Sequence, residues 1–320
     1  MELSLIIPIY NCEKTLPKSL ESIRQQTFSD FEVLLVNDGS NDSCGIICEK
    51  FAHEDTRFKV IHKLNGGASS ARNAGINAST GNWIVFMDAD DEIGEDYLEQ
   101  LYNKRCANGV TVAGFYENNN GKVTLSVDFR MDKTIFNNDS RFQLFDNETF
   151  LMHPSPIAKI FDAEIIRKYN VRFNEDIQLQ EDLLFWTDFL LYAKCVEVTD
   201  PIQYYYLKDN STLTKRNLSF KSADALCRSF IKRSDQIMNG LNKSKSDFLK
   251  MFESIMIFEA VMSISNGSIS LGEQLKHVIN YHVHFSKHVK RYYKPTTKIL
   301  AFEKWLFIYL PFLLPFIKKI

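Results

Sequence analysis

Acidic side chains gather directly after the apolar segment Trp83–Met87. They are Asp88, Asp90 and Asp91, within the sequence Asp-Ala-Asp-Asp. Carboxylates two residues apart can place oxygen ligands around one hard cation such as Mg²⁺ or Mn²⁺. Such an ion takes up the negative charge that develops on a departing phosphate. The same pattern also fits an acidic turn before a helix near Tyr97, so the spacing alone leaves both interpretations open.

Three further motifs can be explained either by a chemical function or by local structure alone. Asp38 lies in an Asp-Gly turn, and its carboxylate could accept a hydrogen bond from a nucleobase N–H. The small-residue stretch Gly66–Asn73 enters a helix, where backbone N–H groups can meet phosphate. Its Arg72 could contact that phosphate or a local carboxylate, and the residues alone favour the carboxylate. Glu181 and Asp182 open an apolar helix, where they suit a general base or simple N-terminal acidity.

Short apolar segments and helical patterns alternate through the first third of the chain. The predicted strands are Leu3–Ile9, Phe31–Val36, Phe58–Ile61, Trp83–Met87 and Val110–Phe115, and the predicted helices are Glu13–Gln26, Ile46–His53, Ser69–Ala78 and Tyr97–Cys106. This alternation predicts an α/β fold with a mostly parallel sheet and helices on both faces. Because ligands bind beyond the carboxyl ends of such strands, the polar residues that follow them are expected to converge.

The remaining sequence predicts less regular structure and then a helical region. Residues 116–150 are polar and Asn-rich, and we expect irregular loops with one hairpin there. A helix at Glu181–Tyr192 and short strands at Cys195–Val198 and Gln203–Leu207 follow, and the pattern is helical from Leu218. The expected parts are a catalytic domain over residues 1–215, a helical extension over 216–298 and an apolar C-terminal segment over 299–320.

Charge and cysteine usage exclude several function classes. The formal net charge of the 320-residue chain is −2, which gives no electrostatic argument for a nucleic-acid partner. The six cysteines lack C-x-x-C spacing, so a zinc site is not expected, and reduced thiols in a cytosolic protein are the favoured interpretation. The N-terminus begins with an apolar strand pattern and shows no signal-peptide features, which also indicates a cytoplasmic chain.

Taken together, these motifs closely resemble the family 2 glycosyltransferases of the GT-A fold over roughly residues 1–215. The resemblance rests on the blocks SLIIPIYNCEKTLPKSLESIRQQTFSDFEVLLVNDGSNDS and NGGASSARNAGINASTGNWIVFMDADDEI, and on the looser AKIF, RFNEDIQLQEDLLF and YYYLKDNST. It implies a Rossmann-like, mostly parallel sheet. It also implies inverting transfer from a nucleotide-diphosphate sugar, with UDP as the expected nucleotide. One departure is Asn37, where many members have a second Asp, and this position bears on donor-base preference.

The resemblance also assigns roles to individual residues. Asp182 matches the catalytic base and Glu181 helps to position the acceptor. Asp88, Asp90 and Asp91 would bind Mn²⁺ or Mg²⁺, with Asp90 nearest the metal. The implied nucleotide-sugar residues are Pro8, Tyr10, Asn11, Asp38, Gly67, Arg72, Asp88, Ala89 and Asp90.

Two alternatives compete with a glycosyltransferase. A catalytically silent nucleotide-sugar-binding or scaffold protein could share the fold, but such a protein has no chemical reason to retain Asp88, Asp90 and Asp182. A sugar nucleotidyltransferase would carry a glycine-rich loop with Arg or Lys after its first strand. This chain has Tyr10-Asn11-Cys12-Glu13 there, which disfavours that class.

The C-terminal sequence suggests contact with a membrane surface. A basic run precedes the apolar segment Trp305–Ile317, which is shorter than the roughly 20 residues of a spanning helix and contains Pro311 and Pro315. Aromatic residues and flanking lysines are typical of an interfacial anchor, although a helix packed on the domain or in a dimer remains open. An anchor at the inner face of the cell membrane would suit a glycan or lipid-linked saccharide acceptor in surface-polysaccharide assembly. The basic run consists of Lys287, Lys290, Arg291, Lys294 and Lys298.

Overall fold

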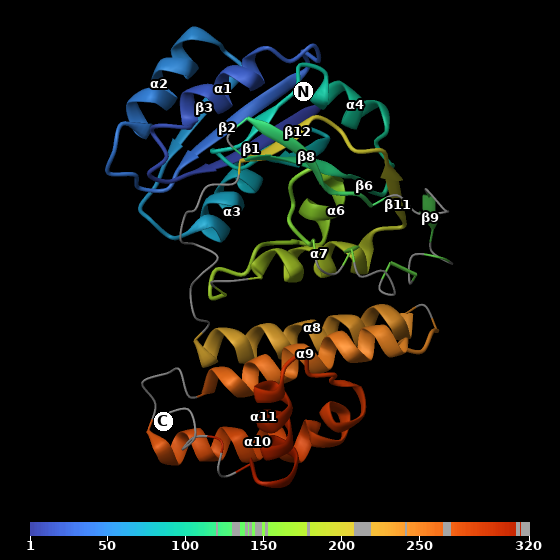
Figure 1. Cartoon of the computed structure of the whole chain (residues 1–320). Coiled ribbons are helices and arrows are strands. Elements are labelled where there is room, and N and C mark those ends of the chain that lie inside the picture. Colours follow the sequence, from blue (N-terminus) through green and yellow to red (C-terminus); the bar gives the residue numbers. More distant parts are fainter. Residues whose placement is uncertain are drawn as a thin grey trace. The chain divides into compact units, whose positions relative to one another are not determined.

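The computed structural model divides the chain into two compact units (Figure 1). It describes residues 1–119, 121–129, 135–137, 140, 143–144, 149–150, 153–177, 180–207, 219–240, 242–264, 270–311 and 314. Unit 1 comprises Met1–Glu175 and Glu181–Asn210, and unit 2 comprises Asp176–Gln180 and Ser211–Ile320. The expected domain boundary at residue 215 lies outside the described residues and stays a prediction.

Two sheets and several helices make up unit 1. Among the described residues, one sheet has the strand order β3-β2-β1-β4-β10-β6-β11-β9 and a smaller one has the order β5-β12-β7-β8. The strands are β1 (Leu3–Ile9), β2 (Phe31–Asn37), β3 (Phe58–His62), β4 (Trp83–Phe86), β5 (Glu92–Ile93), β6 (Gly109–Ala113), β7 (Phe115–Asn119), β8 (Lys122–Val127), β9 (Ile135–Asn137), β10 (Lys159–Asp162), β11 (Cys195–Thr199) and β12 (Tyr204–Leu207). The helices are α1 (Leu16–Arg24), α2 (Cys44–Glu54), α3 (Ala68–Ala78), α4 (Tyr97–Asn103), α6 (Ala163–Lys168) and α7 (Glu181–Tyr192).

The order of the central strands reverses on the two sides of β1. The chain runs outward from β1 through β2 to β3, then returns through α3 to β4 on the other side of β1. Helices α1 and α2 therefore cover one face of the sheet, and α3 covers the other together with α6 and α7 (Figure 1). Such a reversal between β1 and β4 is the point where open α/β sheets bind ligands. The predicted mostly parallel sheet is confirmed.

The apolar runs of β1 and β2 are buried on both faces, as their sequences predict. Two polar residues interrupt them, and they satisfy each other: the Ser4 hydroxyl donates to the Glu32 carboxylate at 2.6 Å. That carboxylate also accepts from the N–H of Thr80 at 2.7 Å and from Lys59 at 2.7 Å. Burial raises the pKa of Glu32, but these hydrogen bonds outweigh it and lower the pKa to about 2.

Two features of the sheet differ from the sequence-based expectation. Strand β10 enters antiparallel between β4 and β6, with Ile160 level with Val85. The expected strand Val110–Phe115 is divided into β6 and β7, which belong to different sheets. At the junction, a Cβ on Gly114 would lie 2.3 Å from the carbonyl oxygen of Val127, so the crossing needs glycine. The one expected hairpin within residues 116–150 corresponds to β7 and β8.

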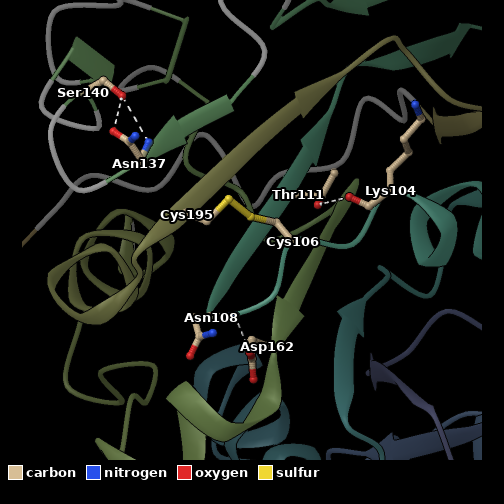
Figure 2. The surroundings of a disulfide bond; sticks show 8 residues. All are labelled: Lys104, Cys106, Asn108, Thr111, Asn137, Ser140, Asp162 and Cys195. Carbon is tan, nitrogen blue, oxygen red and sulfur yellow. Dashed lines mark hydrogen bonds between the residues drawn. A yellow bond between two sulfur atoms is a disulfide. The ribbon is translucent and has the colours of Figure 1, made fainter.

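A disulfide joins Cys106 to Cys195, so the prediction of six reduced thiols is wrong for this pair (Figure 2). Cys195 opens β11 and is level with Gly109 in the parallel pairing with β6, which brings the two cysteines together across 89 residues of sequence. Their Cα atoms lie 6.3 Å apart, within the range that a disulfide spans. The sequence carries no signal for this pairing, because the two cysteines are far apart along the chain. The other cysteines, Cys12, Cys44, Cys48 and Cys227, are free.

Unit 2 is helical, as the sequence predicts from Leu218. Its helices in the described residues are α8 (Phe220–Gly240), α9 (Asp247–Ser263), α10 (Leu271–Tyr292) and α11 (Lys298–Tyr309). In α11, Leu306 and Phe307 are buried, whereas Trp305 and Tyr309 are half exposed. Over the described part of the chain, none of the helices combines the length and the apolar character needed to cross a membrane. Most of the predicted apolar anchor beyond residue 311 lies outside the described residues.

Candidate active site

The loops after β1 and β2 are tied to each other at the carboxyl edge of the sheet. The backbone of Asn11 has a left-handed φ of 49°, which asparagine tolerates better than most residues. Its N–H donates to the Ser40 hydroxyl at 3.1 Å, and its side-chain oxygen accepts from the N–H of Asn41 at 2.9 Å. Tyr10 next to it is 50% exposed. These contacts therefore fix the loop after β1 and leave the aromatic ring of Tyr10 half exposed at the carboxyl edge of the sheet.

Asp38 lies at the end of β2 and organises the small-residue loop before α3. Its buried carboxylate accepts from Lys63 at 2.6 Å, from the N–H of Gly67 at 2.7 Å and from the N–H of Gly66 at 3.0 Å. The Asp-Gly turn thus has a structural function within the loop. The predicted contact between Asp38 and a nucleobase stays a prediction, since a carboxylate can accept further hydrogen bonds.

Three other predicted nucleotide-sugar residues lie near this edge of the sheet. Pro8 is the penultimate residue of β1 and is level with Val36 of β2. Gly67 has a φ of 86° and precedes α3, a conformation that glycine adopts without strain. Ala89 is buried between Asp88 and Asp90.

Arg72 joins the acidic groups that the sequence places far apart. Its guanidinium donates to Asp182 and to Asp88 at 3.1 Å each, and lies 3.5 Å from Glu181. The Arg72 side chain is 7% exposed, and its guanidinium carbon lies 5.2 Å from the centroid of the Phe173 ring. Burial opposes its charge, but the three carboxylates more than compensate and hold its pKa above the usual value. The carboxylate pairing that the residues alone favoured is therefore present.

Partial burial and charged neighbours perturb the acidity of Asp182, the second residue of α7. Burial raises the pKa of Asp182 to about 7, an effect that Glu181 and Asp88 reinforce and Arg72 opposes. Burial also raises the pKa of Glu181. A carboxylate with a pKa near neutrality is well suited to take a proton from a hydroxyl at cellular pH. The backbone of Gln180, directly before the helix, has a left-handed φ of 61°.

The three consecutive acidic positions after β4 do not share one environment. Asp88 and Asp90 are partly exposed, and Asp91 is fully buried. Asp91 accepts from the Tyr204 hydroxyl at 2.5 Å and from the N–H of Leu207 at 2.9 Å, so its carboxylate ties this turn to β12. Burial and the neighbouring carboxylates raise the pKa of Asp91 well above its ordinary value. These contacts account for Asp91 without a metal.

Within the residues that the structure describes, no group of three or more acidic, histidine or cysteine side chains is arranged to hold a metal ion. The predicted set of three aspartate ligands is therefore not assembled by the protein alone. Two carboxylates still fit a hard cation, because Mg²⁺-type ions commonly take one or two protein carboxylates and complete their shell with phosphate oxygens and water. Asp88 and Asp90 are the residues that could supply those two carboxylates.

Two residues at this site had no predicted role. Tyr204 holds Asp91, and its hydroxyl also accepts from the N–H of Asp88 at 3.3 Å. Lys159 at the start of β10 is 2% exposed, and its charge interacts with Asp182. The signal for Lys159 was visible in the sequence as a single cation inside the apolar segment Ile157–Phe161. Tyr204, in a run of three tyrosines, gave no comparable signal.

Comparison with known proteins identifies the same family. The model of the family described as "Glycosyl transferase family 2" matches residues 4–168. Among curated relatives, glycosyltransferase EpsJ of Bacillus subtilis is 33% identical over 66% of this chain and 62% of its own length. Glycosyltransferase GlyG of Streptococcus pneumoniae is 29% identical over 76% of this chain and 83% of its own length.

Solved structures share the fold. The S. aureus TarS fragment 1–349 in complex with UDP-GlcNAc superposes with a TM-score of 0.66 at 24% identity, covering 90% of this chain and 82% of that one. The mannosyltransferase PcManGT of Pyrobaculum calidifontis, in complex with GDP-Man and Mn²⁺, gives a TM-score of 0.51 at 13% identity, covering 99% and 86%. The fold and the family match agree with the geometry of the site, and this chain belongs to the family 2 glycosyltransferases with the GT-A fold.

Proposed function

We propose that the chain is an inverting glycosyltransferase that moves a sugar from a UDP-sugar to a hydroxyl of a glycan or lipid-linked saccharide in surface-polysaccharide synthesis. The observation that carries this proposal is the Arg72 cluster, which gathers Asp88, Glu181 and Asp182 at the carboxyl edge of the sheet. Related proteins support the donor class, because TarS structures contain UDP or UDP-GlcNAc. The relative TarP of Staphylococcus aureus is named a poly(ribitol-phosphate) N-acetylglucosaminyltransferase.

The nucleotide binds where the loops after β1 and β2 meet. The half-exposed ring of Tyr10 provides a flat surface for a base, and Asn11 and Asp38 border the same loops. Arg72 faces the diphosphate. Its Nε has no partner among the described residues although it is buried, which leaves one donor for an anionic ligand.

Asp88 and Asp90 would hold Mn²⁺ or Mg²⁺ together with the diphosphate, and the ion would neutralise charge on the departing nucleotide. Asp182 then accepts the proton of the acceptor hydroxyl as that oxygen attacks the anomeric carbon from the side opposite the leaving group. One bond forms to the acceptor oxygen and one breaks to the phosphate oxygen, so the configuration inverts without a sugar–enzyme intermediate. Glu181, beside the base in the first turn of α7, helps to position the acceptor.

The acceptor is presented at the cytoplasmic face of the cell membrane. The basic residues at the end of α10 and the half-exposed Trp305 and Tyr309 of α11 support a peripheral contact with an anionic lipid surface.

Transfer from a panel of nucleotide sugars in the presence of Mn²⁺ tests the proposed function. We expect wild type to release UDP in the presence of a glycan acceptor and Asp182→Asn to lose that activity while it still binds UDP. Equal activity of both proteins would remove Asp182 as the base. Binding of UDP by wild type without transfer from any donor would favour the catalytically silent alternative.

A further inference from the structure

Lys159 is a buried lysine at the start of β10 whose charge interacts with that of Asp182, and the proposed mechanism gives it no role. Its side chain is 2% exposed at the start of β10. The ammonium nitrogen lies 5.3 Å from the centroid of the Phe129 ring and 5.5 Å from that of Trp186. It donates to the backbone carbonyl oxygen of Ser155 and lies 3.5 Å from that of His153. Lysine is seldom fully buried, because its charge loses hydration there.

The register of β10 explains why this cation lies near the base. Because β10 runs antiparallel to β4 with Ile160 level with Val85, Lys159 stands at the carboxyl end of β4, the end that leads to Asp88. Phe161, two residues further, is on the same face of the strand as Lys159. It packs against Phe185 of α7, with ring centroids 5.6 Å apart. Lys159 therefore faces the helix whose first turn carries Asp182.

The charges that surround Asp182 come from four elements. Arg72 lies on α3, Glu181 on α7 itself, Asp88 after β4, and Lys159 on β10. Arg72 is shared among three carboxylates and is the group that faces the donor diphosphate. Lys159, in contrast, interacts mainly with Asp182. Burial lowers the pKa of Lys159 to about 7, and the negative charge of Asp182 acts in the opposite direction.

Packing alone does not call for a lysine at this position. A methionine or leucine between the Phe129 and Trp186 rings would avoid the desolvation of a charge, and apolar replacements of buried charges are often neutral or stabilising when the site repacks. The cation therefore needs a reason other than packing, and its electrostatic interaction with the Asp182 carboxylate supplies one.

We propose that Lys159 is a positioning residue for glycosyl transfer, which keeps the Asp182 carboxylate ionised and fixes the backbone of residues 153–158 through the carbonyls of His153 and Ser155. This inference rests on the proposed function, since it assumes that Asp182 is the base. The backbone supports the second part: Ala158, directly before Lys159, has a left-handed φ of 51° that the surrounding contacts must maintain.

The test compares the pH dependence of kcat/KM in wild type, Lys159→Met and Lys159→Arg. Without the cation, Asp182 should hold its proton to higher pH. We therefore expect Lys159→Met to move the acidic limb of the profile upward by about one pH unit, with roughly tenfold lower activity below the limb. Lys159→Arg should keep the limb near its wild-type position. Lys194→Met, the same change at an exposed lysine of unit 1, is the matched control and should leave the profile unchanged.

The outcomes separate this inference from the proposed function. A folded Lys159→Met protein with the wild-type acidic limb would overturn the inference, even if its thermal stability changed. Lys159→Gln, whose amide can still donate to the Ser155 carbonyl, takes the place of Lys159→Met if that variant does not fold. An acidic limb shifted upward in Lys159→Gln would then support the inference, and a wild-type limb would overturn it. Absence of transfer by wild type would instead reject the proposed function.

Discussion

Asp182 is partly buried within a cluster of charges, so its protonation state should control the rate. Because its pKa is raised to about 7 and the base must be ionised to accept a proton, kcat/KM should fall as the pH drops through about 7. Asp182→Asn should reduce kcat by about 10²- to 10⁴-fold and remove this limb. Initial rates between pH 5.5 and 9 check both points. Unchanged UDP affinity in the variant would show that the loss is chemical, and a limb retained by the variant would contradict the assignment.

Asp90 is proposed to bind the metal, and its replacement should affect activity but not stability. Asp90→Ala should abolish metal-dependent transfer and leave the melting temperature close to that of wild type, because Asp90 is partly exposed. Titration of Mn²⁺ against the transfer rate measures the first effect. Full activity of Asp90→Ala at ordinary Mn²⁺ concentrations would exclude Asp90 as a ligand.

Replacement of Tyr204 should affect stability, because its hydroxyl donates a hydrogen bond to the buried Asp91 carboxylate. Tyr204→Phe removes the hydroxyl that donates to the buried carboxylate and should destabilise the fold by about 1–3 kcal/mol. Urea unfolding of wild type and variant measures this difference in free energy. An unchanged unfolding midpoint would mean that the Asp91 hydrogen bond contributes no net stability.

The strand pattern predicted that Asp88 lies at the carboxyl edge of the sheet, and the family resemblance placed Arg72 and Asp182 at the same site. Neither the pattern nor the resemblance separated Asp91 from its neighbours. That distinction depends on Tyr204, which lies more than a hundred residues away and reaches the turn only through the second sheet. The proposed role of Lys159 toward Asp182 has no signal in the local sequence for a similar reason, since β10 joins the sheet out of sequence order.

At the level of elements, the buried Glu32 links β1, β2, β3 and the turn before β4. Its folded pKa of about 2 lies below the ordinary value of 4.5, so its contribution to stability is fully present above about pH 4.5. That contribution is lost as the pH falls toward 2, where the folded state also takes up the proton. Glu32→Gln should therefore destabilise the protein by about 2 kcal/mol at pH 7 and by much less at pH 3. Denaturant midpoints at both pH values test this, and an equal difference at both would contradict it.

The sequence predicted the elements of the first third well because buried parallel strands have continuous apolar runs. It merged β6 and β7 into one strand, since nothing in Val110–Phe115 shows that the chain changes sheets at Gly114. Only the close approach of the Val127 carbonyl makes that glycine necessary. Local periodicity identifies a strand, but the strands that pair with it depend on segments distant in sequence.

At the level of the whole molecule, the proposed membrane contact depends on the end of the chain. A protein truncated before Trp305 should lose binding to vesicles that contain anionic lipid, whereas the full chain should bind less strongly as salt increases. Co-sedimentation with vesicles measures both effects. Transfer to a soluble acceptor should be retained, since the proposed catalytic residues lie in unit 1. Equal sedimentation of both proteins would rule out the anchor and favour a packed helix or a dimer contact.

The bond between Cys106 and Cys195 makes a covalent ring of the segment that separates them (Figure 2). The Asn-rich region and β10 with Lys159 both lie inside this ring. A protease that cuts once within residues 116–152 would therefore release no fragment: both pieces would migrate as one species on a denaturing gel and separate only after reduction. In a reducing cytosol the ring would open, so the same gel run on freshly alkylated cell extract would report which form of the enzyme cells contain.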